Sequence, residues 1–430
     1  MKFARRQFVQ ATSGAAVLGA LQLPTAIHAE TARASEPDKV VVGIMGMQRG
    51  LALAKEFLRQ ANVEVRYVCD VDQRRLDRAT ATLQADFDSK SLPVGDFRKI
   101  LDDDAVDALV CAAPNHWHGP ATILACSAGK HVYVEKPASH NPAEGEWMVE
   151  AAAKHSKLVQ VGMQRRSNSR WIDAVKRVHE GLLGDVFLAK SWYSNSRGSV
   201  GNDRDAEVPE YLDYDLWQGP AAARPYSPAV VHYNWHWRWN WGNGEIGNNG
   251  VHTLDLCRWG LQQQLPESTL SVGGRHAFSD AQETPDTNTA SFQFPGGLRA
   301  TWEGNSCHRM KSGFVTLFGT EGRLEMDENG ANRHFDRKGV LVSEVDGSPH
   351  SLRDHIANFL DCIRGEKSAD QLNANIAIGH RSALLCHLAN IAYRTDRIVK
   401  TDPETGRILN EERAEEFWQR EYRSGWKPAV

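Results

Sequence analysis

The chain lacks the features that mark membrane, nucleic-acid-binding and disulfide-stabilised proteins. Past its N-terminal segment, none of its apolar runs approaches the roughly 18 residues of a membrane span, so the mature chain is expected to be soluble. It has no long basic block and a formal net charge of -4, which argues against nucleic acid as a partner. Its seven cysteines are an odd number with no CxxC pair, which argues against a disulfide framework and a cysteine-ligated metal site.

The overall composition of the chain is ordinary, and only its tryptophan content is unusual. Apolar residues make up 41% and charged residues 24% of its 430 positions, as in most globular proteins. A chain of this length exceeds one ordinary core, which predicts two domains. Its 13 tryptophans are unusual, and burial is the expectation for most of them.

Residues 1–34 are expected to be a targeting segment rather than part of the fold. Arg5 and Arg6 precede the weakly apolar stretch "ATSGAAVLGALQL", which is too short and too rich in alanine and glycine to span a membrane. This pattern is typical of a twin-arginine export signal with cleavage near Ala29 or Ala34, and it predicts a periplasmic protein. The alternative is a disordered basic N-terminus.

Residues 38–160 alternate strand and helix patterns. Amphipathic segments of about 10–15 residues separate five predicted strands, which are "KVVVGIMG", "VEVRYVCDVD", "VDALVCAAP", "KHVYVEKP" and "KLVQVGMQRR". This alternation predicts a parallel sheet with right-handed crossovers. We therefore expect an α/β fold that begins with a Rossmann domain, the architecture that binds NAD or NADP.

The turn after the first strand is where such a domain meets the pyrophosphate of a dinucleotide. The stretch "GIMGMQRG" forms an imperfect G-x-G-x-x-G there. It predicts cofactor contacts from Gly46, Met47, Gln48 and Arg49. A glycine-rich turn that binds no ligand is the alternative.

Asp70 ends the second predicted strand, 20 residues after Gly50. An acidic side chain at this place binds the ribose 2′-OH and repels a 2′-phosphate, so NAD is favoured over NADP. Arg74 and Arg75 follow closely and leave NADP open. The alternative role for Asp70 is to cap the next helix, which Asp72 could do equally well.

Two loops at the ends of later strands, "APNHWHGP" (113–120) and "YVEKPASHN" (133–141), point to a family. Together with the glycine-rich turn before His252 and "GHRSALLCHLANIAYR" near the end, they make the chain resemble the glucose–fructose oxidoreductase / inositol dehydrogenase (Gfo/Idh/MocA) family. The resemblance runs from about residue 38 to about residue 395. It implies further cofactor contacts from Pro114, Asn115, His118, Glu135, Lys136 and Gln164.

Lys136, in the Glu-Lys-Pro motif, is a catalytic residue by this resemblance. A lysine among apolar neighbours near a nicotinamide has its charged form disfavoured, so its pKa should fall towards neutrality. It can then hydrogen-bond a substrate hydroxyl and help to move the proton. The resemblance also implies a cis bond before Pro137. The alternative for Lys136 is a surface lysine at a strand end.

After Gln164 the pattern changes to longer strands with less helix between them. This predicts a C-terminal α+β domain over residues 161–395, with a large, mostly antiparallel open sheet, and a tail over residues 396–430. In the family such a sheet carries the substrate side and often pairs with a second subunit. A broad exposed sheet face needs cover, so a homodimer or homotetramer is expected.

An irregular insertion, residues 196–244, interrupts this sheet, and long insertions in compact domains are usually functional. Its segment "WHWRWNW" (235–241) has a tryptophan at every second position. This period predicts an extended strand with four indoles on one side and His236, Arg238 and Asn240 on the other, lining the cleft. The tryptophans either bury against the sheet, as expected for most, or stack on a sugar ring.

His252 is the second catalytic residue that the resemblance implies, because the family places a D-x-x-x-H pair here with the histidine as acid/base. The position four before it is Asn248, and an amide orients a hydroxyl but does not accept a proton as a carboxylate does. His252 and Lys136 must therefore carry the proton relay. The expected substrate-binding residues are Arg165, Trp235, Arg238, Asn248 and His252.

These features predict an exported, NAD-dependent oxidoreductase that acts on a hydroxyl of a sugar, polyol or glycoside. Free NAD is not expected outside the cytoplasm, so the cofactor should bind before export and stay bound. One alternative is an NAD-dependent glycoside hydrolase or lyase that oxidises its substrate transiently. A second is a non-catalytic NAD- or sugar-binding module. No metal site is expected, because the histidines with ligand-like spacing have no accompanying carboxylate or cysteine cluster.

Overall fold

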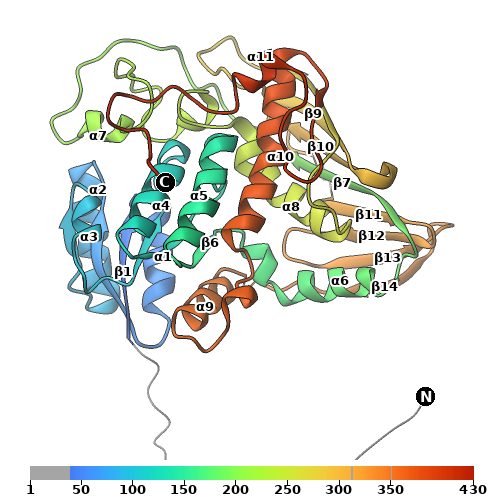
Figure 1. Cartoon of the computed structure of the whole chain (residues 1–430), viewed down its shortest axis with the longest axis horizontal. Helices are drawn as coiled ribbons and strands as arrows, with labels where there is room; N and C mark the ends of the chain where they lie inside the picture. The colour runs from blue at the N-terminus through green and yellow to red at the C-terminus, as the bar shows by residue number, and fades with distance from the viewer. Residues whose placement is uncertain (1–38, 311–312, 350) are drawn as a thin grey trace, which may run out of the picture. The chain divides into compact units, whose positions relative to one another are not determined.

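The computed structural model describes residues 39–310, 313–349 and 351–430 (Figure 1). The predicted export signal lies outside these described residues. No helix in the described ranges is long and apolar enough to cross a membrane. Two sheets organise the chain, one in its first part and one in its second.

The first sheet has six parallel strands in the order β3-β2-β1-β4-β5-β6. Its strands are β1 (Val40–Met45), β2 (Val63–Cys69), β3 (Leu92–Val94), β4 (Ala108–Cys111), β5 (His131–Val134) and β6 (Val159–Val161). All six residues of β1 and all four of β4 are buried, as expected for strands covered on both faces. The order reverses between β1 and β4, which is where a Rossmann sheet binds its ligand. The predicted Rossmann fold is confirmed.

Helices connect these strands and begin at identifiable caps. They are α1 (Arg49–Leu58), α2 (Gln73–Phe87), α3 (Arg98–Leu101), α4 (Asn115–Ser127) and α5 (Pro142–Lys154). The side chain of Asp72 caps α2 by accepting the N–H of Arg74 at 2.9 Å, and Asn141 caps α5 by accepting the N–H of Glu144 at 3.1 Å. The capping role that was open to Asp70 therefore belongs to Asp72.

The second sheet has nine strands in the order β14-β13-β12-β11-β7-β10-β9-β8-β15. These are β7 (Val186–Ser194), β8 (Ser268–Gly274), β9 (Thr287–Gln293), β10 (Arg299–Asn305), β11 (Val315–Gly319), β12 (Gly322–Met326), β13 (Asn332–Asp336), β14 (Leu341–Val345) and β15 (Val399–Lys400). The pairing of β10 with β7 is parallel, and the other pairings are antiparallel. The predicted open, mostly antiparallel sheet is confirmed.

Helices from the second half cover one face of this sheet and join it to the first (Figure 1). They are α6 (Ser169–His179), α8 (Val251–Gly260) and α10 (Ile376–Thr395), with α9 (Ser351–Ile363) and the short α11 (Glu412–Glu415) beside them. Helix α10 packs against α5 on one side and against α8 and β8 on the other. The core beneath them contains the fully buried rings of Trp171, Phe292 and Trp302.

The tryptophan-rich segment is not the extended strand that its alternation predicts. Residues Asn234–Trp237 form a 3₁₀-helix, and a tight turn follows in which the N–H groups of Trp241 and Gly242 bond to the carbonyl of Arg238. The four indoles make ring contacts with His236 (Trp235), Arg197 (Trp237), Arg394 (Trp239) and Trp217 (Trp241). Trp235, Trp237 and Trp241 are buried, in agreement with the expectation for most of the four. Aromatic packing therefore overrides the period-2 pattern here.

Candidate active site

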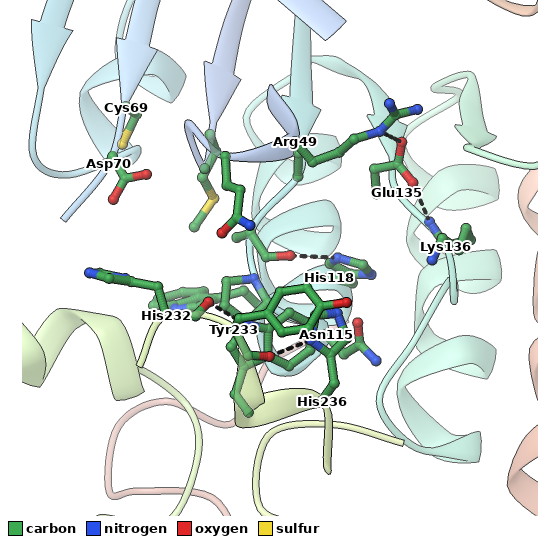
Figure 2. Close-up of a pocket in the computed structure, with 18 of the residues that line it drawn as sticks. Arg49, Cys69, Asp70, Asn115, His118, Glu135, Lys136, His232, Tyr233 and His236 are labelled. Atoms are coloured by element: carbon green, nitrogen blue, oxygen red, sulfur yellow. Dashed lines mark hydrogen bonds and ion pairs between the residues drawn. The ribbon is translucent and has the colours of Figure 1, made fainter. Parts of the chain in front are cut away.

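A cavity of about 580 Å³ lies at the carboxyl ends of the parallel strands, and this volume suits a small-molecule site. Figure 2 shows Asp70 at one end and Lys136 at the other, with His232, Tyr233 and His236 facing them from the insertion. Most of the residues predicted from sequence line it. These are Gly46, Gln48, Arg49, Asp70, Pro114, Asn115, His118, Glu135, Lys136, Gln164, Arg165, Trp235 and His252.

The glycine turn is shaped by two of its residues. Gly46 has φ +90°, and a Cβ built on it would lie 2.6 Å from the backbone oxygen of Ala112, so only glycine fits there. The N–H of Met47 donates to Asp70 Oδ2 at 2.7 Å, while its side chain is buried in the core. Met47, predicted as a cofactor contact, is thus absent from the cavity lining, because its side chain packs inward and its N–H already has a partner.

Asp70 organises the end of the cavity at β2. Its second oxygen, Oδ1, accepts the N–H of Asp72 at 3.0 Å. Burial raises the pKa of the Asp70 carboxyl, and the two backbone donors, Arg75 and His232 oppose that rise. Arg75 also lines this end and donates to Gln48 Oε1 at 3.2 Å. Asp70, which favours NAD, and Arg75, which would favour NADP, therefore both lie at this end of the cavity.

Part of the insertion, residues 209–236, closes over this end of the cavity, and we call it the cover segment. It pairs with the chain beyond β2, because the N–H of Gln73 donates to the carbonyl of Tyr211 at 2.9 Å and the N–H of Asp213 donates to Val71 at 3.0 Å. His232 Nε2 lies 2.9 Å from Asp72 Oδ2. These contacts join positions about 140 to 160 residues apart, so local sequence patterns could not reveal them.

The cover segment supplies three site residues that the sequence did not identify, Trp217, His232 and Tyr233, and it also brings in His236, whose place in the cleft the alternation predicted. Trp217, His232, Tyr233 and His236 line the cavity, and His236 stacks on Trp235 with ring centres 3.6 Å apart. Burial lowers the pKa of His236 to about 3, so this ring is neutral. The aromatic richness of residues 196–244 was the one available indication of their importance.

Lys136 lies at the opposite end, at the carboxyl end of β5. Its Nζ donates to the backbone oxygen of Asn248 at 2.8 Å and to Asn248 Oδ1 at 3.0 Å. Burial lowers the pKa of Lys136, Glu135 opposes this, and Arg49 and Arg165 add to it. The expected direction of the pKa change is therefore found, and the bond between Lys136 and Pro137 is cis as expected.

Glu135 anchors the loop that carries Lys136. Its carboxylate accepts Arg49 Nε at 2.9 Å and the N–H of Lys136 at 3.3 Å, and the Gln164 amide lies 3.5 Å away. The ring nitrogens of His118 lie 2.6 Å from the carbonyl of Pro137 and 2.8 Å from that of Ala113. This imidazole therefore ties the two motif loops together.

His252 lies in the first turn of α8, directly after the π-helix Ile246–Gly250. Its ring makes no hydrogen bond with another described residue. Burial holds the pKa of His252 well below its usual value, and the cations Arg165, Lys136 and Arg49 lower it further. The histidine is thus neutral and faces the cavity with Lys136.

Two predicted substrate contacts are placed differently. Arg238 is buried outside the cavity lining, because Asp203 at 2.5 Å and Glu283 at 3.5 Å hold its guanidinium. The structure therefore does not bring Arg238 to this cavity, where its contact with the substrate was predicted. Asn248 is also absent from the lining and acts through its two hydrogen bonds to Lys136.

Comparison with family models assigns both halves of the chain. Residues 38–163 match an oxidoreductase family model described as an NAD-binding Rossmann fold. Residues 189–428 match the C-terminal alpha/beta domain of an oxidoreductase family. The two matches cover the two sheets in turn.

Individual relatives are distant. A glycosyl hydrolase family 109 protein of Shewanella sp. (strain W3-18-1) is 26% identical over 165 residues, which are 37% of this chain and 36% of that protein. A levoglucosan dehydrogenase of Pseudarthrobacter phenanthrenivorans is 23% identical over 250 residues, 53% of this chain and 57% of that protein. The matched regions thus span less than two thirds of each relative.

A solved structure extends the likeness over most of the chain. An aldose-aldose oxidoreductase from Caulobacter crescentus, complexed with glycerol, has a TM-score of 0.65 and 19% identity, and the match covers 84% of this chain and 99% of that chain. At this identity the likeness establishes the shared fold.

Proposed function

The chain belongs to the Gfo/Idh/MocA oxidoreductase family, and from that membership we propose that it transfers hydride between NAD and a hydroxyl-bearing carbon of a sugar, polyol or glycoside. One observation carries the proposal. The features of a dinucleotide site and two side chains suited to proton transfer, Lys136 and His252, line a single cavity. A module that only binds NAD or a sugar has no need of this combination.

The residues at the β2 end fit a dinucleotide. No described side chain caps the N-terminus of α1, so the backbone N–H groups there suit a pyrophosphate. Gln48 and Arg49 flank that turn, and Asp70 keeps acceptor capacity for a ribose hydroxyl after its two backbone bonds. NAD, when bound, supplies the hydride acceptor of the oxidation.

At the β5 end, Lys136 and His252 bind the substrate hydroxyl, and His252 accepts its proton. Asn248 fixes the direction of Lys136 Nζ through two hydrogen bonds, which leaves the third ammonium donor for the substrate. His252 is neutral, so a ring nitrogen is free to accept the hydroxyl proton, and the surrounding cations oppose the imidazolium that results.

The cover segment supports a cofactor that stays bound during turnover. Three contacts hold this segment against the β2 end: its pairing with residues 71–73, the Arg74 guanidinium 3.4 Å from the ring centre of Tyr211, and the contact of His232 with Asp72. We expect these contacts to slow the release of a ligand bound there. Retention of this kind suits a protein that acquires its cofactor before export. Because its N-terminus has paired arginines, we propose that the protein is exported to the periplasm by the twin-arginine route.

A second candidate reaction follows from one relative. The likeness to a glycosyl hydrolase family 109 protein favours a cycle in which a glycoside is oxidised, loses its aglycone, adds water and is reduced again. Such a cycle releases free sugar with no net change in the bound cofactor, whereas a dehydrogenase leaves the cofactor reduced.

The test begins with the protein purified without dialysis. Its absorbance spectrum and mass spectrometry of the supernatant after denaturation should show NAD(H). Sugars, polyols and glycosides are then screened for a change in nicotinamide absorbance, and the same mixtures are analysed for released sugar. If no nucleotide co-purifies and neither NAD nor NADP binds when added, the redox proposal is wrong.

A further inference from the structure

The reacting end of the cavity holds more positive than negative charge. Arg49, Lys136 and Arg165 all line it beside His252. Glu135 neutralises Arg49 at 2.9 Å, and Glu328 contacts Arg165 at 2.5 Å. Among the described residues, Lys136 Nζ bonds only to the side-chain and backbone oxygens of Asn248.

The nearest further carboxylate does not balance this excess. Glu245 is close enough to Lys136 to act on its pKa, but its own oxygens bind Arg197 at 2.6 Å and Ser306 at 2.9 Å. That ion pair is neutral as a whole. One positive charge therefore remains uncompensated where the substrate must sit.

The contact between Arg165 and Glu328 is of a kind that a ligand can replace. The Arg165 side chain is 14% exposed, whereas the Glu328 side chain is 75% exposed on the turn between β12 and β13. A single Arg165 nitrogen meets Glu328, although a guanidinium can offer a carboxylate two parallel donors. An ion pair with so exposed a partner contributes little, so exchanging Glu328 for another carboxylate costs little.

Arg165 itself is held firmly at the mouth of the site. Its guanidinium lies 4.6 Å from the ring centre of Phe314, and burial lowers its pKa, which a second anion would relieve. Both Arg165 and Glu328 line the main cavity and an adjoining surface pocket. The pair thus lies at the entrance from solvent.

We propose that the substrate is a sugar acid, and that Arg165 binds its carboxylate in exchange for Glu328. The inference rests on the proposed oxidoreductase function and narrows its substrate class. A uronate or a glycoside of a uronic acid brings the missing negative charge, and a planar carboxylate matches the forked donors of arginine.

The test compares sugars that differ in one group. Glucose and glucuronate, and galactose and galacturonate, are titrated against the cofactor-loaded protein by tryptophan fluorescence, and cofactor reduction is followed with the same pairs. Glucuronate should bind about 10- to 100-fold more tightly than glucose, as for a hydrogen bond to a charged group. Glucose 6-phosphate is the anionic comparison, and binding tighter than that of glucuronate would overturn the assignment to a carboxylate.

Two variants at the pair should act in opposite directions. Arg165→Gln should remove most of the preference for glucuronate over glucose, measured as the ratio of the two, chiefly through KM. Glu328→Gln should strengthen glucuronate binding, because Arg165 then has no competing partner. A merely structural ion pair would weaken both sugars in both variants. Arg407→Gln is the matched control, since it removes an exposed positive charge paired with Glu146 outside both pockets.

The outcomes separate the two proposals. If glucose and glucuronate bind equally, or if Arg165→Gln leaves their ratio unchanged while sugars still reduce the cofactor, the sugar-acid proposal is wrong and the oxidoreductase function stands. If no sugar of either kind binds or changes the cofactor, both fall.

Discussion

Asn248 holds Lys136 Nζ through two hydrogen bonds, and replacing it with aspartate should shift the ionisation of that lysine measurably. Lys136 Nζ lies 3.0 Å from Asn248 Oδ1. A carboxylate oxygen at that distance attracts the ammonium by about 5 kcal/mol at an effective dielectric constant of about 20. Desolvation of the new carboxylate offsets much of this attraction, so the pKa of Lys136 should rise by about 1 to 3 pH units.

The sign of the effect on activity follows from the role of Lys136. Lys136 acts as an ammonium that donates to the substrate oxygen while His252 takes up the proton, and a raised pKa keeps this ammonium form to higher pH. The alkaline limb of the pH–rate profile for substrate oxidation, where Lys136 loses its proton, should therefore move upward by the same 1 to 3 pH units or so in Asn248→Asp. Single-turnover reduction of the bound cofactor across a pH series measures this shift without interference from product release.

The control keeps the backbone contact and adds no charge. The backbone carbonyl of residue 248 lies 2.8 Å from Lys136 Nζ in the unaltered protein, and it still accepts this hydrogen bond in Asn248→Ala. The limb of the pH–rate profile should therefore stay close to that of the unaltered protein. If Asn248→Asp is folded and loaded with cofactor but its limb coincides with that of the unaltered protein, Lys136 is not the group whose ionisation limits the reaction.

Three further changes test other parts of the site. His252→Gln should lower the single-turnover rate about 10²- to 10⁴-fold while cofactor content stays normal, because only the proton acceptor is lost; an undiminished rate contradicts its role. His232→Ala, which removes the contact with Asp72, should release NAD(H) about 2- to 5-fold faster in a fluorescence chase, and an unchanged release rate would mean that the cover segment does not retain the cofactor. Replacing Arg5 and Arg6 by lysines should leave cofactor content unchanged and hold the protein in the cytoplasm on cell fractionation; periplasmic protein would refute the export route.

The dinucleotide fold could be predicted because each of its elements is specified locally. The stretch "VVVGIM" is apolar throughout, which is what a strand covered on both faces needs, and Asp72 and Asn141 start their helices through side chains adjacent in sequence. The two motif loops follow strands of one parallel sheet, so their meeting at one edge also follows from the order of elements. Gly46 and Asp70 were found in this way, whereas the role of Lys136 was predicted from the resemblance of its Glu-Lys-Pro motif to the family.

The insertion could not be predicted, because distant partners determine its conformation. Trp241 packs on Trp217 with ring centres 5.4 Å apart, and Trp237 lies 4.6 Å beneath the Arg197 guanidinium. His232 pairs with a carboxylate 160 residues earlier. A period of two says only that an isolated segment favours a strand, and such preferences are weaker than these packing contacts.

The sequence shows that residue 248 is an amide, but only the structure shows that Asn248 contacts Lys136. The change from an acid to an amide in the D-x-x-x-H pattern predicted a weaker proton relay, with the side chain facing the substrate. In the structure a π-helix precedes α8, and both the carbonyl and the side-chain oxygen of Asn248 meet Lys136 Nζ. No periodicity in "EIGNNGVHTLD" predicts that local helix. The amide therefore orients Lys136 without neutralising its positive charge. The reacting end of the cavity keeps this charge, which an anionic substrate can neutralise.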